Sequence, residues 1–109
     1  MADDLITRLR AQLGGPRDGA LLRFSLGHAL HAAGDRDAAA GALREALGFD
    51  ARYSAAWKLL GRVLADAGDA PAAVEAWTQG IAAAQARGDV QAAKEMAVFL
   101  RRLQTPQAG

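Results

Sequence analysis

Two histidines lie three residues apart, at positions 28 and 31, and are the side chains best suited to bind a metal ion in this sequence. At this spacing both imidazoles project from the same side of a helix. Zinc in proteins is usually held by three or four ligands, and the nearest further candidate, Asp35, is needed at a helix start. The sequence contains no cysteine. We therefore expect no metal, and we interpret His28 and His31 as polar groups that line a surface.

Residue combinations that perform catalysis are missing. The sequence shows no nucleophile motif, no phosphate-binding loop and no paired catalytic carboxylates. The segment Gly14-Gly15-Pro16 breaks a helix, and Asp3-Asp4 places favourable negative charge at a helix start. We expect a protein that is not an enzyme and has no cofactor.

Lys58 and Arg62 are four residues apart, so both can point the same way from one helix. An arginine can hold a carboxylate through two hydrogen bonds, and a lysine acts as a point charge. The pair fits an acidic or C-terminal peptide, but it is also compatible with an ordinary solvated helix face. The whole chain has 13 basic and 12 acidic residues and a net charge of +1, which argues against binding to nucleic acid.

The composition predicts an all-α domain. The chain has 109 residues, enough for one compact domain, and 51% of them are hydrophobic but only 6% aromatic. β-Branched residues are sparse, which argues against a sheet. No apolar run is long enough to span a membrane, and the acidic N-terminus does not resemble a signal peptide. Together with the absence of cysteine, this fits a cytoplasmic protein.

Part of the chain repeats itself. Residues 26–35 and 60–69 share the pattern Leu-Gly-x-x-Leu-x-x-Ala-Gly-Asp at an offset of 34 residues. Glycine inside a helix costs about 1 kcal/mol relative to alanine. We therefore expect Gly27 and Gly61 to mark the close approach of a second helix, with Ala39 and Ala73 as the contacts.

Each repeat is predicted to be a pair of antiparallel helices. Gly34 and Gly68 are suited to end a helix, and the aspartates that follow are suited to cap the next one. Ser54 is a plausible N-cap. The predicted helices are 20–33, 36–48, 54–67 and 70–87, with flanking helices at 3–13 and 89–103. The resulting organisation is an N-terminal helix at 3–13, repeats at 20–53 and 54–87, a capping helix at 88–104 and a disordered tail at 105–109.

A 34-residue unit of two helices resembles the tetratricopeptide repeat. The residues of the second unit that match the family pattern are Trp57, Leu60, Gly61, Leu64, Ala73, Trp77 and Gly80, and those of the first are Leu26, Gly27, Leu30, Ala39, Leu43 and Ala46. Trp57 and Trp77 are accordingly expected in the core. Arg23 stands where the family favours Trp, and Ala51 and Gln85 stand where it favours Pro, so the last helix of the second unit should run on towards Arg87. The resemblance implies a short right-handed α-solenoid with flanking capping helices.

The resemblance also implies binding to another protein. Tetratricopeptide arrays use the first helix of each unit to line a concave groove that holds an extended peptide or a helix of a partner. The matching groove positions here are Phe24, Ser25, His28, His31, Lys58, Leu59, Arg62 and Asp66. Phe24 would anchor an apolar side chain. Some family members clamp a terminal carboxylate with Lys and Asn, but the Asn residues are absent here.

The alternative is a structural, self-associating protein. Two units form only a small groove, and apolar residues near the ends of the chain could pair with a second copy. The candidates for such a homo-oligomeric contact are Leu5, Ile6 and Phe99.

Overall fold

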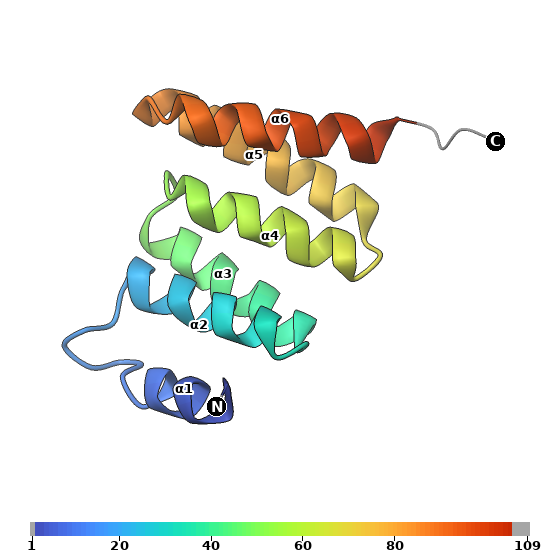
Figure 1. Cartoon of the computed structure of the whole chain (residues 1–109). Helices are drawn as coiled ribbons and strands as arrows, with labels where there is room; N and C mark the ends of the chain where they lie inside the picture. Colours follow the sequence, from blue (N-terminus) through green and yellow to red (C-terminus); the bar gives the residue numbers. More distant parts are fainter. Residues whose placement is uncertain (1, 106–109) are drawn as a thin grey trace.

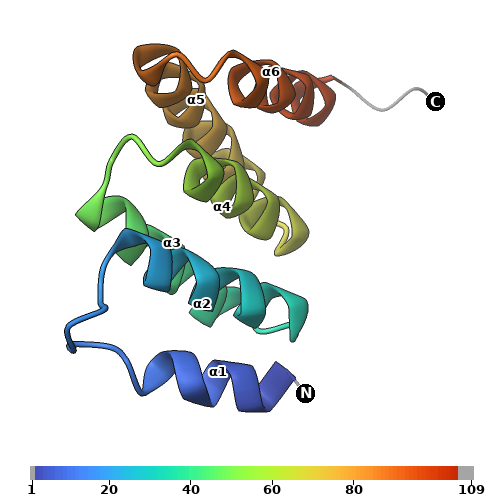
Figure 2. The same ribbon diagram turned by 60° about the vertical axis from the view of Figure 1, so that its left-hand side comes forward.

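The protein is a stack of antiparallel helices (Figure 1). The computed structural model describes residues 2–105, which form six helices and no strand. They are α1 (Ala2–Arg10), α2 (Ala20–Ala32), α3 (Arg36–Phe49), α4 (Ser54–Asp66), α5 (Ala70–Arg87) and α6 (Val90–Gln104). The α2–α3 and α4–α5 hairpins lie next to each other, with α1 at one end of the stack and α6 at the other (Figure 2). The molecule is elongated, measuring 47 × 32 × 19 Å.

The turns after α2, α4 and α5 share one geometry. Each contains a glycine in the left-handed conformation, namely Gly34, Gly68 and Gly88, with φ between +79° and +84°. The aspartate that follows each glycine donates its backbone N–H to a carbonyl five residues earlier, as in the Schellman motif. Its carboxylate then accepts a 3.2 Å hydrogen bond from the third backbone N–H beyond it, which caps the next helix. The predicted roles of Asp35 and Asp69 are confirmed.

The helices of each pair approach most closely at Gly27 and Gly61, as predicted. A Cβ atom would overlap the Leu43 side chain if added at Gly27, and the Trp77 indole if added at Gly61. The nearest atoms to such a Cβ belong to the large side chain one turn beyond Ala39 or Ala73 on the second helix. The Ala39 carbonyl oxygen is also close, at 3.4 Å from a Cβ placed at Gly27.

The two tryptophans differ in burial. Trp77 is 4% exposed, and its indole N–H donates to the Lys58 carbonyl oxygen at 3.1 Å. Trp57 is only partly buried, and its indole N–H reaches the Ala51 carbonyl oxygen at 2.8 Å. The prediction of a core residue therefore holds fully for Trp77 and in part for Trp57, which packs at the edge of the core.

The terminal helices cover the open ends of the core. Ile6 of α1 is buried, Met96 of α6 is fully buried, and the Phe99 ring lies 5.5 Å from the Trp77 ring. Ile6 and Phe99 therefore have partners within the chain, and of the three residues considered for self-association only Leu5 is exposed. The other side of α6 presents polar residues such as Lys94 and Arg101 to solvent, as a cap of a repeat array should.

Three sequence predictions concern helix ends. The extension of the last helix of the second unit is confirmed, since α5 runs for 18 residues to Arg87. The flanking helix α1 ends at Arg10 rather than at residue 13, because the chain tightens there into turns that lead into Gly14. The prediction that Ser54 caps α4 is wrong: Tyr53 occupies the cap position, and the buried Ser54 hydroxyl donates to Asp89 at 2.7 Å. Of the tail predicted to be disordered, residues 106–109 lie outside the described part of the chain.

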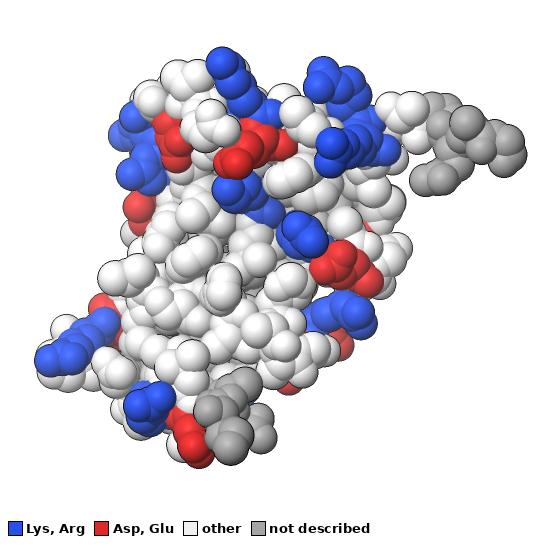
Figure 3. All heavy atoms as spheres, in the orientation of Figure 1, with Lys and Arg blue, Asp and Glu red and all other residues white. Residues whose placement is uncertain are grey.

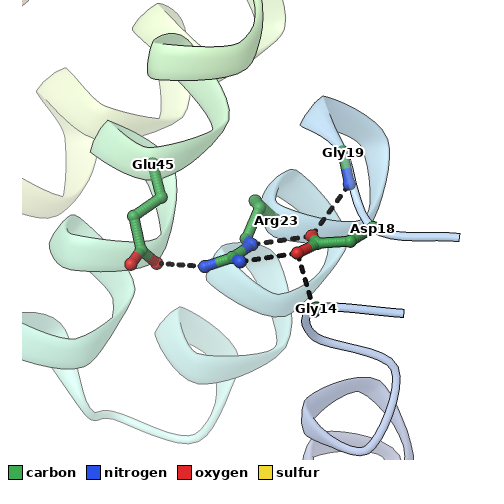
Figure 4. A network of polar contacts seen from close by, with 5 residues as sticks. All are labelled: Gly14, Asp18, Gly19, Arg23 and Glu45. Atoms are coloured by element: carbon green, nitrogen blue, oxygen red, sulfur yellow. Dashed lines mark hydrogen bonds and ion pairs between the residues drawn. The ribbon is translucent and has the colours of Figure 1, made fainter. Parts of the chain in front are cut away.

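A polar network anchors the loop between α1 and α2 (Figure 4). The Asp18 carboxylate accepts hydrogen bonds from the backbone N–H groups of Gly14 and Gly19, both at 2.8 Å. It also accepts two from the Arg23 guanidinium, at 2.8 and 2.7 Å. The same guanidinium lies 3.1 Å from Glu45 of α3. Arg23 thus replaces the tryptophan of the family pattern with an ionic contact that joins the loop, α2 and α3.

This network predicts an acid-sensitive stability. The hydrogen bonds from Arg23, followed by the one from Gly14, hold the pKa of Asp18 well below its usual range. A carboxylate with a lowered pKa in the folded state stabilises the protein above its unfolded pKa of about 3.9, and this contribution is lost as the pH falls further. Between pH 7 and pH 2.5 the melting temperature of the Asp18→Asn variant should therefore fall less than that of the wild type. Asp37→Asn, at an exposed carboxylate on α3, should keep the wild-type response, and equal slopes for all three proteins would contradict the prediction.

Candidate protein-interaction surface

Helices α2, α4 and α6 lie side by side and form one face of the molecule, with α3 and α5 behind them (Figure 1). All eight predicted groove residues belong to α2 and α4. We call this face the inner face, and three contacts join its helices to one another or to the α3–α4 loop. The His31 Nε2 atom lies 3.0 Å from Asp66 Oδ2, the Phe24 and Tyr53 rings are 5.1 Å apart, and the Lys58 ammonium donates to Glu95 of α6 at 2.9 Å.

The positive charges of the inner face are balanced by carboxylates of the same chain. Lys58 is paired with Glu95, and Arg62 Nε lies 4.0 Å from Asp66. The two cations expected to receive an acidic peptide thus have carboxylate neighbours within the chain. The side chain of Arg62 is 63% exposed and lies at the limit of ion-pair distance, so its guanidinium can still receive a hydrogen-bond acceptor from outside.

Apolar side chains occupy the middle of the inner face. Phe24 and Leu59 are partly buried and pack against the core, while the exposed His28 ring stands 6.4 Å from the Phe24 ring. Ser25 is partly buried on α2. In Figure 3 an area of this face over α2 and towards the beginning of α4 carries no Lys, Arg, Asp or Glu, whereas charged groups follow the rest of α4 and gather over α6.

The prediction from sequence missed three residues of this face. Leu21 is 70% exposed and precedes Phe24 by three residues, so it lies on the same side of α2. Tyr53 and Glu95 come from the α3–α4 loop and from α6. The spacing could have revealed Leu21, but Tyr53 and Glu95 reach the face only through the stacking of the helices.

The opposite side of the molecule has a small cleft. It opens between α3 and α5, has a volume of about 260 Å³, and is floored by Leu60 and Leu64 of α4. Arg44 and Glu75 stand at its rim. Because both floor residues are less than 10% exposed, the cleft offers little apolar area to a partner.

Among the side chains of residues 4–105, no group of three or more His, Cys, Asp or Glu is arranged to hold a metal ion. In the same part of the chain, none of the helices combines the length and apolar character needed to cross a membrane.

Stacked helical hairpins with a cap at each end define the class of the molecule, an α-solenoid repeat protein. No family model matches the chain. It is 48% identical over 99 residues to the TPR repeat-containing protein PA0015 of Pseudomonas aeruginosa, covering 91% of this chain and 94% of that protein. The chain therefore belongs to the tetratricopeptide-repeat family. Proteins of this family generally mediate protein–protein interaction and generally act as non-catalytic scaffolds.

Solved structures share the fold. Protein BPP2914 from Bordetella parapertussis is 50% identical, with a TM-score of 0.79 over 91% of this chain and 86% of that one. A tetratricopeptide repeat domain protein from Salinibacter ruber shares the fold at 18% identity, with a TM-score of 0.77 over 86% of this chain and 94% of that one. The Sgt2 TPR domain from Aspergillus fumigatus does so at 24% identity, with a TM-score of 0.70 over 99% and 76% of the two chains.

Proposed function

We propose that the inner face binds a peptide segment or a helix of a partner protein. The observation that carries this proposal is the uncharged area over α2 and the beginning of α4, bordered by charged groups on the rest of α4 and on α6 (Figure 3). An apolar centre with a polar border is the usual anatomy of a protein–protein interface.

The chemistry of the inner face suggests what the partner presents. An apolar side chain would lie against Phe24 and Leu59, where it loses contact with water. A carboxylate next to it in the partner would reach Arg62, since Lys58 is already paired with Glu95. We therefore favour a partner with an apolar anchor and one neighbouring acidic group over a generally acidic peptide.

The binding face can be located by NMR spectroscopy. Peptides selected from a displayed library against the immobilised protein would be titrated into isotope-labelled protein, and changes of backbone amide shifts would be mapped. We expect the largest changes at Ser25, His28, Leu59 and Arg62. Changes confined to α3 and α5, around the small cleft, would move the binding site to the other side of the molecule and refute the proposal.

Reversing the charge of Arg62 should weaken such a peptide. Arg62→Glu removes a charge-assisted hydrogen bond worth about 1.5–3 kcal/mol, which corresponds to a loss of affinity of roughly tenfold or more. Isothermal titration calorimetry on the selected peptide measures the effect. Arg36→Glu makes the same charge change at an exposed position on α3 and should leave the affinity unchanged. Equal losses for the two variants would indicate a non-specific electrostatic effect.

A further inference from the structure

Two arginines line a hollow at the edge of the stack where the α3–α4 loop meets the end of α5. The hollow has a volume of about 330 Å³ and is lined by Arg52, Arg87 and Asp50. Arg52 Nη2 donates to the Ala86 carbonyl oxygen at 2.8 Å, and Arg87 Nη1 donates to the Arg52 carbonyl oxygen at 3.0 Å. These reciprocal bonds fix both guanidinium groups between the loop and the helix end.

Most of the hydrogen-bonding capacity of the two guanidiniums is unused. Each side chain has five N–H donors, and each uses one of them on a carbonyl oxygen. Among residues 4–105, no carboxylate lies within ion-pair distance of either group. Two prepositioned cations with free donors are thus left facing a solvent-filled hollow, whereas Arg23 and Lys58 have carboxylate partners at 2.7 and 2.9 Å.

Two aspartates lie near this hollow and oppose its positive charge. Asp50 uses Oδ1 to accept the backbone N–H of Arg52 at 3.0 Å, and it lines the hollow. Asp89 lies close enough to Arg87 for their opposite charges to attract. Both of its carboxylate oxygens, however, already accept a hydrogen bond, one from the Ser54 hydroxyl and one from the Ala92 backbone N–H. The pKa of Asp89 is lowered, first by the bond from Ser54, so this carboxylate is satisfied within the fold.

We propose that Arg52 and Arg87 form a binding site for a phosphate group. The planar guanidinium binds phosphate oxygens through two parallel N–H donors, and two such groups can together match a doubly charged tetrahedral anion. The phosphate group can be free inorganic phosphate or part of a phosphorylated side chain. The site lies in the loop and at the helix end, apart from the eight predicted groove residues, and its existence does not depend on the proposed function.

The test is a titration of the isotope-labelled full chain, with the Nε–Hε signals of the arginines as the readout. Inorganic phosphate and phosphoserine would be added separately, with sodium chloride and acetate as controls at the same ionic strength. We expect saturable shifts of the Arg52 and Arg87 signals with phosphate, and weaker, non-saturating shifts with acetate and chloride. Binding of phosphoserine at least as tight as that of inorganic phosphate would indicate a phosphorylated partner, and weaker binding would indicate the free anion. Equal responses to phosphate and sodium chloride would overturn the proposal.

Three variants separate binding from folding. Arg87→Gln should weaken phosphate about tenfold by removing a charge-assisted contact. Asp50→Asn keeps the oxygen that accepts the Arg52 N–H but removes the opposing charge, so it should tighten phosphate several-fold, a gain that a merely structural role would not produce. Arg36→Gln, at an exposed position on α3, should change nothing. An unchanged affinity in both Arg87→Gln and Asp50→Asn would refute the site.

Discussion

Replacing Gly61 with alanine is expected to destabilise the protein by about 2 kcal/mol, although alanine is the better helix former. The added methyl group would overlap the indole of Trp77, which is 4% exposed and held by its hydrogen bond to the Lys58 carbonyl oxygen. The ring cannot move aside without losing that bond or displacing α4 from α5. The free energy of unfolding from chemical denaturation measures the effect.

The matched control is Gly41→Ala on α3. Apart from its chain neighbours and the backbone of its own helix, no atom lies within 4 Å of a Cβ at Gly41, and its φ is not positive, so alanine there should stabilise the protein by about 0.5–1 kcal/mol. Both substitutions replace glycine with alanine within a helix, but the expected changes in the free energy of unfolding have opposite signs. A Gly61→Ala variant as stable as the wild type would show that the contact with Trp77 is not tight.

A second variant tests the cause of the effect. Leu43 occupies in the first unit the place that Trp77 occupies in the second, and it packs on Gly27. Because a leucine at that place would also overlap an added Cβ, the variant used is Trp77→Ala. With it in place, the added cost of Gly61→Ala should shrink, since the overlapping ring has been removed. The coupling energy of this double-mutant cycle should be favourable and of the order of 1 kcal/mol. Additive effects would point to a cause other than overlap.

Replacing Met96 with alanine is expected to destabilise the protein by about 3 kcal/mol. Met96 is fully buried, and its sulfur lies against Gly80 of α5, so its removal leaves a cavity under the C-terminal cap. Thermal and urea unfolding followed by circular dichroism would measure the loss.

The control for this prediction lies on the same helix. Gln91 is exposed, and Gln91→Ala should change the stability by less than about 0.5 kcal/mol. If Met96→Ala were equally mild, α6 would be a loosely attached appendage rather than a structural cap. The proposed inner face would then lose the fixed position of Glu95 beside Lys58.

The helices and turns could be predicted because their signals are local. A glycine that ends one helix and an aspartate that caps the next are neighbours in sequence, as at Gly34 and Asp35, and their geometry follows from backbone sterics. Ser54 shows where such signals fail. Its type suits an N-cap, but the acceptor for its hydroxyl, Asp89, lies 35 residues away, and only the stacking of α4 and α6 brings them together.

The candidate surface could be predicted in position but not in charge. Helix periodicity places Lys58 and Arg62 on one side of α4. The nearest carboxylate to Lys58 belongs to Glu95, 37 residues further along on the capping helix, and no local pattern pairs the two. The residue that packs against Gly61 was also not predicted from the sequence. A small residue was expected opposite this glycine, but the indole of Trp77 packs directly on it.

The nearest-neighbour arrangement of the stack has a consequence for how the chain acquires its structure. Each described helix contacts only the helices one or two places away in the sequence. No helix near the beginning of the chain needs a contact with a helix near its end. Little loop-closure entropy is therefore lost at any single folding step, and proteins whose contacts are this local in sequence fold quickly. During synthesis, the α2–α3 hairpin can form its close contact at Gly27 while the residues of α6 are still inside the ribosome.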